Sequence, residues 1–231
     1  MKNILARGGI EFLAVLLGIT VSLYIEEIKS KNNTNDIINE SLVKIVEELN
    51  EIKINMNLMI EKFEDQKSYY RTAIEAKNLN RMNSDQLDIM NWKIQSPIGR
   101  NINTLAYESI KSTGILYKID NEDIKMGIIK LYGDYLERYR YTSEYERDYC
   151  IKFDQLILTD IFVLRHDESD VNWFLDWDNP INYDTYSSNI EFRNKLIALY
   201  NLKKLLIGRC ELVIEGVDKL ISMLSIEIKT D

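Results

Sequence analysis

A carboxylate lies inside the longest apolar run of the chain, where an acid could act on ions or contact a partner helix. Glu11 is followed at helical spacing by Ala14, Gly18 and Ser22, so all four residues share one helix face. Small residues at this spacing let membrane helices approach closely, and an acid among them is a candidate functional group. Since Glu11 lies only one turn inside the run, an interfacial acid that reaches headgroups and water is the favoured interpretation. We expect this face to mediate contacts between copies of the helix.

A second set of candidate residues lies in the segment 167–189, where acids alternate with aromatic side chains. Acid clusters can hold calcium, but the segment lacks the spacing of an EF-hand. Aromatic-rich irregular segments can bind protein partners, and the same rings could instead cover one end of a helical bundle. We therefore expect structural cover or a partner surface, and no metal. The candidate partner-binding residues are Trp173, Phe174, Asp176, Trp177, Asp178, Tyr183 and Tyr186.

The sequence lacks the signatures of the common enzyme classes. It contains no P-loop, no GxGxxG, no GxSxG and no HExxH motif. One histidine, His166, cannot build a multi-histidine metal site. Paired carboxylates occur throughout so acidic a chain and therefore identify no catalytic pair. We expect a protein with no enzymatic activity and no cofactor.

The composition favours long helices and argues against nucleic acid as a partner. The 231 residues include 29 basic and 37 acidic side chains, and the resulting net charge of −8 repels a phosphate backbone. Only two prolines and nine glycines are present, fewer than a turn-rich β protein needs. Cys150 and Cys210 allow one disulfide, but two buried free thiols are the favoured interpretation.

The apolar run Gly8–Ile25, which reads GGIEFLAVLLGITVSLYI, predicts a membrane anchor. As a helix it would span roughly 27 Å, close to a hydrocarbon core of about 30 Å. A cleaved signal peptide fits less well because no small-residue cleavage site ends the run. A buried core helix would show a polar face. We therefore predict a single-pass anchor at residues 1–28 and a polar linker at 29–35. The flanking charges slightly favour a body on the extracytoplasmic side.

Residues 36–231 are predicted to form a helical bundle. A seam of apolar residues spaced alternately by four and three begins it: Ile38, Leu42, Ile45, Leu49, Ile52, Met56, Met59 and Phe63. Further apolar residues widen this stripe beyond the needs of a two-stranded coiled coil: Val43, Val46, Ile54, Leu58 and Ile60. The width favours a bundle within the chain, with part of the stripe left for a partner subunit.

Further helices are predicted at about 103–113, at about 121–148 and at about 190–228. Gly114 is a helix stop, and Asp120 or Asn121 is an N-cap. Residues 79–98 are predicted to be irregular, with Trp92 packed on the bundle; the residues expected to break the helix are Asn80, Asn83, Asn91 and Pro97. Half-buried packing is the expected role of four tyrosines, a stacking platform for a ligand being the alternative: Tyr132, Tyr135, Tyr139 and Tyr149. The last helix is predicted to bury one face: Phe192, Leu196, Leu199, Leu206, Val213, Val217, Leu220 and Leu224.

Two segments of the chain resemble a known group of proteins. They are E-F-L-A-V-L-L-G-I-T-V-S-L, which starts at Glu11, and A-Y-E-S-I-K-S-T-G-I-L-Y-K-I-D-N-E-D-I, which starts at Ala106. In this order they resemble the DUF6090-like bacterial single-pass membrane proteins of unknown function. The resemblance extends over residues 1–140. It implies a bacterial protein of the inner membrane and carries no known reaction.

Two hypotheses of function follow. In the first, the chain is a non-enzymatic, membrane-anchored homo-oligomer whose anchors meet along the Glu11 face. If enough helices gathered, that face could line a pore with Glu11 as a cation-favouring ring, as in a membrane-disrupting effector of antiviral defence. In the alternative, one helix tethers a sensor or interaction module that binds a protein partner through the segment 167–189.

Overall fold

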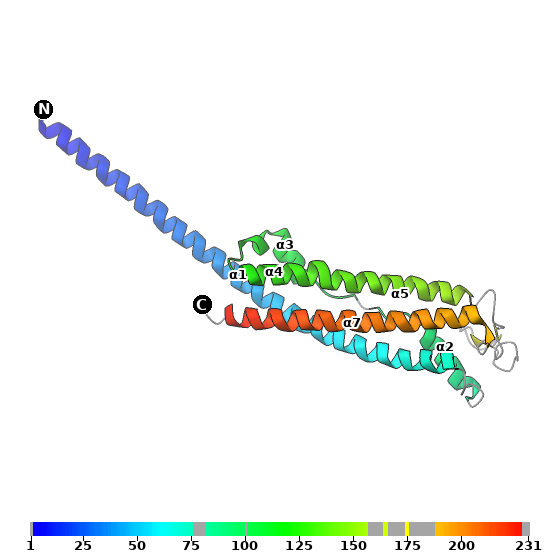
Figure 1. The fold of residues 1–231 in the computed structure, drawn as a ribbon. Coiled ribbons are helices and arrows are strands. Elements are labelled where there is room, and N and C mark those ends of the chain that lie inside the picture. Colours follow the sequence, from blue (N-terminus) through cyan, green and yellow to red (C-terminus); the bar gives the residue numbers. More distant parts are fainter. Residues whose placement is uncertain are drawn as a thin grey trace.

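The computed structural model consists almost entirely of helices (Figure 1). It describes residues 2–75, 82–99, 101–156, 164–165, 174–175 and 188–227, with only the backbone described for 2–15, 30–32 and the two strands. The helices are α1 (Lys2–Glu75), α2 (Ser84–Gln95), α3 (Leu105–Ser112), the 3-10 helix η2 (Ile115–Lys118), α4 (Glu122–Lys130), the π-helix η3 (Leu131–Tyr135), α5 (Leu136–Leu156) and α7 (Ile190–Glu227). Strands β1 (Leu164–Arg165) and β2 (Phe174–Leu175) pair antiparallel. The predicted all-α fold class is confirmed.

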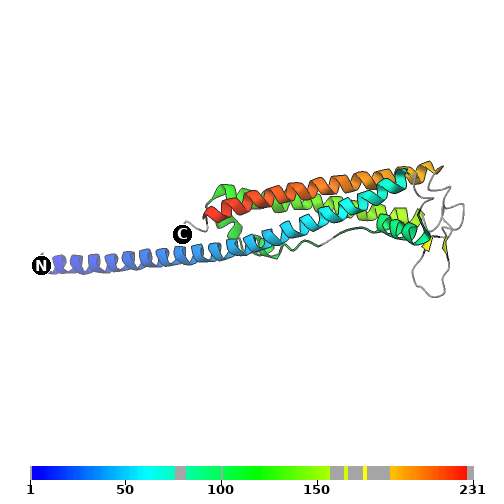
Figure 2. The ribbon, with the colours of Figure 1, turned by 90° about the horizontal axis from the view of Figure 1, so that it is seen from below.

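Helix α1 is the longest element and extends well beyond the bundle. It has 74 residues, which corresponds to about 111 Å at the usual rise per residue. Its C-terminal half packs along α7 and near α5, while its amino-terminal part projects away from the other helices (Figures 1 and 2). Residues 29–35, which we expected to form a linker, continue the helix. Their sequence is polar but contains neither glycine nor proline, so nothing in it breaks the backbone hydrogen bonds.

The predicted seam of α1 forms the main core. From Leu42 to Phe63 every seam residue is at most 2 % exposed, and Ile38 is half-buried. All predicted face residues of α7, from Phe192 to Leu224, are also buried. Of the residues that widen the stripe, three are exposed: Val43, Ile54 and Leu58. The bundle is therefore confirmed, and a partner subunit on these exposed positions stays a prediction.

Helix α2 corrects the prediction of an irregular segment at 79–98. Asn83 does not break the chain but caps the helix: its side chain accepts from the Gln86 amide, and the Gln86 side chain accepts from the Asn83 amide. Trp92 is 67 % exposed, so its predicted packing on the bundle was wrong. The buried face of α2 is formed by Leu87, Met90, Asn91 and Ile94, and Trp92 points away from it.

The helix boundaries near residue 114 follow their local signals. Helix α3 ends at Ser112, and Gly114 has a φ of 74°, the left-handed conformation that glycine adopts without strain. Asn121 then caps α4 by accepting from the Ile124 amide. The predicted third helix is a continuous stack of α4, η3 and α5. A Cβ at Gly216 of α7 would lie 2.9 Å from the Tyr135 ring, so this glycine lets η3 pack closely on α7.

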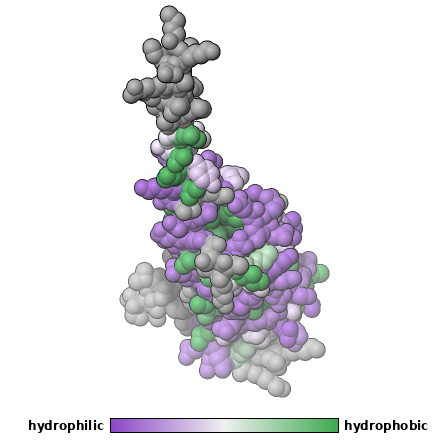
Figure 3. Space-filling model, turned by 90° about the vertical axis from the view of Figure 1, so that its left-hand side faces the viewer, coloured by the Kyte–Doolittle hydropathy of each residue, from purple (hydrophilic) through white to green (hydrophobic). Residues whose placement is uncertain are grey.

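No helix in the described part of the chain combines the length and the apolar character needed to cross a bilayer. The first side chains of the run Gly8–Ile25, up to residue 15, lie outside the described residues. Those from Leu16 to Ile28 are exposed, and Figure 3 shows them as an apolar band on the projecting part of α1. The large apolar members of this band are Leu16, Leu17, Ile19, Val21, Leu23, Tyr24, Ile25 and Ile28.

Candidate functional site

The predicted contact face on α1 is described only in part. The side chains of Glu11 and Ala14 lie outside the described residues, and their positions belong to the projecting part of α1. Gly18 and Ser22 are exposed, and a Cβ at Gly18 would have no atom within 4 Å. No other described segment covers these two positions. Their role in contacts between copies of the chain therefore stays a prediction.

The predicted partner surface lies almost wholly outside the described residues. This holds for Trp173, Asp176, Trp177, Asp178, Tyr183 and Tyr186. Phe174 is described by its backbone alone, as the β2 residue that pairs with Arg165 of β1. Among the residues that the structure describes, no group of three acidic, cysteine or histidine side chains could hold a metal. The partner surface stays a prediction.

The structure shows a buried ionic cluster that the sequence analysis missed. Glu146 of α5 and Lys203 of α7 are both fully buried, with the Lys203 Nζ atom 2.5 Å from Glu146 Oε1. The ammonium also lies 5.1 Å from the centroid of the Phe63 ring, a cation–π contact with α1. Charges taken out of water must be paired to be tolerated. This pair therefore joins three helices at one point in the interior.

Cys150 and Tyr70 surround the carboxylate of Glu146. The Cys150 thiol donates to Glu146 Oε1 over 3.1 Å. Burial, together with the negative charge of Glu146, raises the pKa of Cys150. Burial likewise raises the pKa of the Tyr70 hydroxyl, which donates to the Ile94 carbonyl at 2.7 Å. Both Cys150 and Cys210 are free and buried, as predicted. With a raised pKa, Cys150 remains a thiol at neutral pH and is a poor nucleophile.

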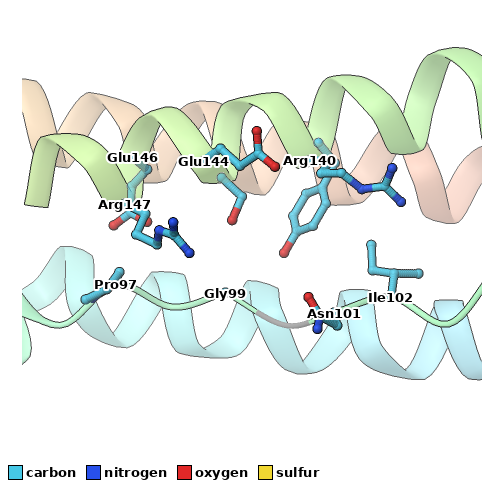
Figure 4. A pocket seen from close by; sticks show the side chains of 10 residues that line it. Pro97, Gly99, Asn101, Ile102, Arg140, Glu144, Glu146 and Arg147 are labelled. Atoms are coloured by element: carbon cyan, nitrogen blue, oxygen red, sulfur yellow. The ribbon is translucent and has the colours of Figure 1, made fainter.

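A cavity of about 680 Å³ opens beside this cluster, between α5 and the segment 97–102. Figure 4 shows Glu146 and Arg147 pointing from α5 toward the segment that carries Pro97 and Gly99. Two buried atoms of residues that line the cavity have no hydrogen-bond partner: Glu146 Oε2 and the Tyr139 hydroxyl. Buried polar atoms are normally satisfied, so these two oxygens are exceptions, and neither of them has surface accessible to water.

Tyr139 is 2 % exposed and lies on the face of α5 that packs on the core. Burial raises its pKa, and the Ser143 hydroxyl opposes part of that rise. However, no hydrogen bond of normal geometry joins the two hydroxyls. Tyr139 was predicted to pack half-buried on the core, and it is in fact fully buried. Its hydroxyl is buried with it and has no hydrogen-bond partner.

The rim of the cavity is exposed and carries charges of both signs. Arg140 and Arg147 are both exposed, and Arg140 forms an ion pair with Glu137. No described residue is joined to the Arg147 guanidinium by a hydrogen bond or an ion pair. Glu144 and Asn101 complete the rim. The Glu146–Lys203 pair behind the cavity is neutral overall, and the described part of the rim combines two guanidinium groups, one of them paired with Glu137, with the carboxylate of Glu144.

The segment that forms the far wall is held at both ends by α1. Gln66 donates to the Lys93 and Ser96 carbonyls, and Glu48 accepts from the amides of Ala106 and Tyr107. Gln66 and Glu48 are separated by about 27 Å along a helix. Nine residues lie between Ser96 and Ala106, so side chains of α1 hold the connection from α2 to α3 at both of its ends.

The sequence did contain a signal for the cluster. The buried positions of α5 include Tyr139, Thr142, Glu146, Cys150 and Phe153. Glu146 therefore occupies a place in the apolar pattern where a hydrophobic residue would be expected. Lys203 likewise falls between Leu199 and Leu206 on the buried face of α7. Opposite charges at seam positions of two helices predict a buried pair, and a search for such interruptions would have found it.

Comparison of the chain with protein-family models, with curated proteins and with solved structures finds no match. The resemblance to the DUF6090-like proteins therefore stays a prediction.

Proposed function

We propose that the protein is a non-enzymatic, membrane-anchored helical scaffold that assembles with copies of itself. The observation that carries this proposal is the apolar band on α1. From Leu16 to Ile28 the large apolar side chains are 44–64 % exposed on a helix that no other described element covers. Exposed apolar surface of this kind is rare on soluble monomers and marks contact with lipid or protein.

The length of the whole run favours a lipid bilayer as the partner that covers the apolar band. Counted in the sequence, Gly8–Ile25 would span roughly 27 Å as a helix, and a bilayer core is about 30 Å thick. Helix α1 extends over this run without a break. The bundle itself is acidic, so charge would not hold it on an anionic lipid surface. Attachment must therefore come from the apolar run.

Small residues on one side of the run support self-association as the second step. Ala14, Gly18 and Ser22 repeat every four residues, and Gly18 is open to close approach. Copies that met along this side would bring Glu11 residues together. A pore is the most demanding form of this proposal, because it also needs enough helices to enclose water.

Membrane attachment is tested by expressing the full chain in a bacterium and extracting the membrane fraction with alkaline carbonate. The full chain is expected in the carbonate-resistant pellet. A variant with Leu17→Glu and Val21→Glu is the matched control, since both positions are exposed and far from the bundle core. It should move to the soluble fraction with unchanged helix content. A full chain that is washed off like the control would disprove anchoring.

Self-association is tested by disulfide crosslinking in those membranes. Single cysteines at Gly18 and Ser22 are expected to crosslink, while cysteines at Leu16 and Leu23 should not. The native thiols do not interfere, because Cys150 and Cys210 are buried and burial raises the pKa of each. Equal crosslinking at all four positions would contradict a specific face. Leakage of a dye from liposomes tests the pore, and intact liposomes with crosslinked protein would exclude it.

A further inference from the structure

We propose that two copies of the bundle bind each other in antiparallel orientation, through the exposed face of α7 and the side of α5 next to it. The proposal concerns the bundle alone and does not rest on membrane attachment. It is carried by exposed apolar and aromatic side chains on this face, and by charges that match when the second copy is reversed.

The exposed face of α7 lies opposite its buried side. Asn201, Leu205, Gly208, Leu212 and Glu215 follow one another at spacings of four and three, so they share one side of the helix. Leu205 and Leu212 are 45 % and 41 % exposed. A Cβ at Gly208 would have no atom within 4 Å, so the backbone is open to a second helix at this point. Helices approach most closely where the side chains at the contact are small.

Helix α5 presents its own exposed residues at the same level of the bundle. It runs antiparallel to α7 and beside it (Figures 1 and 2), and the Glu146–Lys203 ion pair joins the two helices. Tyr141 precedes Glu146 by five residues, and Gly208 follows Lys203 by five residues. Because the helices are antiparallel, Tyr141 lies at the level of Gly208.

Tyr141 and Tyr145 lie on the side of α5 that faces α7. Asp134 lines the cleft between η3 and α7, and its ion pair with Arg138 places both residues on one side of the helix stack. Tyr141 and Tyr145 continue that side at spacings of three and four. Their exposed fractions are 73 % and 53 %. Exposed aromatic side chains are enriched in protein interfaces, so the two tyrosines widen the face of α7 into a contact surface.

Charges on α7 favour a second copy as the partner and set its direction. Lys204 and Glu211 are exposed and form no ion pair with a described residue. When two α7 helices cross antiparallel at Gly208, residues at similar distances on the two sides of the crossing meet. Lys204 of each copy then lies beside Glu211 of the other, and Leu205 lies beside Leu212. In a parallel pair each residue would lie beside its own copy, so like charges would repel.

The same two-fold axis makes the α5 side self-complementary. It passes at the level of Tyr141, so the Tyr141 rings of the two copies meet and can stack with an offset. Arg138 lies three residues before Tyr141, and Tyr145 lies four residues after it. The guanidinium of each copy therefore reaches the Tyr145 ring of the other, a cation–π contact. One rotation pairs the apolar, charged and aromatic groups together.

The antiparallel orientation has a consequence for an anchored chain. Every copy carries the projecting part of α1 at the same end of its bundle (Figure 1), so the two projections of such a dimer point in opposite directions. The contact would then join copies held in two facing membranes. This consequence rests on the proposed anchoring, whereas the contact between bundles does not.

The contact is tested by analytical ultracentrifugation of the Leu17→Glu, Val21→Glu chain, which lacks the apolar band. We expect dimers at protein concentrations of about 10–100 μM. Lys204→Glu or Glu211→Lys in this chain should weaken the dimer at least tenfold, because each change brings like charges together. The Lys204→Glu, Glu211→Lys double variant should recover it, since opposite charges then face each other again. An equimolar mixture of the two single variants should recover it for the same reason.

Lys62→Glu is the matched control for these charge reversals. Lys62 is exposed on α1, and the change alters the net charge as much as Lys204→Glu does. It should leave the dimer unaffected. A chain that is monomeric at about 100 μM would overturn the proposal. A double variant as weakly associated as the single ones would also overturn it.

Gly208→Leu separates the contact from folding. The added side chain has open space in the bundle, and leucine favours a helix more than glycine does, so thermal stability should not fall. At the crossing point the same side chain would hold the two helices apart, so the dimer should be lost. A Gly208→Leu chain that dimerises as before would contradict a crossing at this residue.

The joining of membranes is tested with lipid vesicles that carry the full chain. The vesicles should cluster and raise the turbidity, while vesicles with the Gly208→Leu chain should stay apart. Separate vesicles with a bundle that dimerises in solution would disprove the joining of two membranes. A full chain that does not enter the vesicles would contradict the anchoring, and not the contact between bundles.

Discussion

Two buried glutamates of the bundle, Glu48 and Glu146, differ in how many of their carboxylate oxygens accept hydrogen bonds. Both carboxylate oxygens of Glu48 are used: Oε2 accepts from the Ala106 amide, and Oε1 accepts from the Tyr107 amide and the Tyr132 hydroxyl. Glu146 uses Oε1 for Lys203 and Cys150, while Oε2 has no partner. The first residue has its hydrogen bonds completed by the protein, and the second has them only half completed.

The difference follows from the groups that the packing of the helices places around each acid. Glu48 caps the start of α3, where Thr104 provides no side-chain cap, and its partners are mostly backbone amides. It also fixes Tyr132, which stacks on Tyr107 with the ring centroids 4.2 Å apart. Glu146 instead pairs with the ammonium of Lys203, and its second oxygen is buried without a hydrogen-bond partner. Burial alone does not distinguish the two; the number of completed hydrogen bonds does.

The largest effect is expected from Lys203→Met. Removal of the ammonium leaves Glu146 buried without its counter-charge, and such a change costs about 3–5 kcal/mol of unfolding free energy. The double variant Glu146→Leu with Lys203→Met should recover most of this loss, since it removes both charges. Urea denaturation of the bundle monitored by circular dichroism measures both. A double variant as unstable as the single one would contradict the pairing.

The next effect is expected from Glu48→Ala. Two backbone amides and the Tyr132 hydroxyl lose their acceptor, and the unfolding free energy should fall by about 2–3 kcal/mol. Unlike the Lys203 variant, the damage should be local. Hydrogen exchange should increase most at Ala106 and Tyr107, the amides that Glu48 accepts from. Unchanged exchange at these amides would show that α3 does not depend on Glu48.

A smaller effect separates the two tyrosines that accompany these acids. Tyr132→Phe removes a hydrogen bond to Glu48 and should cost about 1 kcal/mol, whereas Tyr139→Phe removes a buried hydroxyl without a partner and should be neutral or stabilising. Thermal unfolding of both variants in the absence of ligand gives the comparison. A destabilised Tyr139→Phe would mean that its hydroxyl is satisfied in solution.

The smallest effect is a loss of stability at mildly alkaline pH. Burial raises the pKa of Cys150 in the folded chain, while in the unfolded chain the thiol titrates near its ordinary value of 9.0. Above that pH the unfolded state holds fewer protons than the folded state, so stability is complete below about pH 9 and falls as pH rises. Cys210, whose pKa is raised to about 12 by burial, adds to the slope.

The contribution of Cys150 is isolated by Cys150→Ala. Between pH 8 and 9.5 the unfolding free energy of this variant should depend less on pH than that of the native chain. Cys210 would account for the slope that remains. Tyrosines begin to contribute only nearer their ordinary value of 10.0. An unchanged slope in the Cys150→Ala variant would show that the thiol beside Glu146 does not remain protonated.

The sequence predicted those parts of the fold that depend on apolar periodicity. The seam from Leu42 to Phe63 and the buried face of α7 were both predicted residue by residue, because a helix presents every third or fourth residue to its neighbours. Predictions based on polar residues were less successful. Asn83 was taken for a breaker although it is a cap, and the polar residues 29–35 were taken for a linker although they are helical.

The candidate cavity could not be predicted from local patterns. Its interior depends on Glu146 and Lys203, which are 57 residues apart, and its outer wall on Glu48 and Gln66 of α1. Which of two acidic residues receives backbone amides, and which receives an ammonium, depends on how the helices pack. A sequence without aligned relatives carries the charges but not their pairing.

Helix α1 passes from the projecting band into the core without interruption. Each residue of an α-helix turns the next by 100°. Gly18 and Leu42 are 24 residues apart, so the direction of Gly18 is fixed at about 240° from the direction in which Leu42 enters the core. The number of residues between Gly18 and Leu42 therefore sets the angle between their directions about the helix axis as well as the distance between them along it. If copies of the run met along Gly18, all bundles would be turned the same way about that contact. One residue added at 29–35 would rotate every bundle by a quarter turn or more while the contacts at both ends stayed intact.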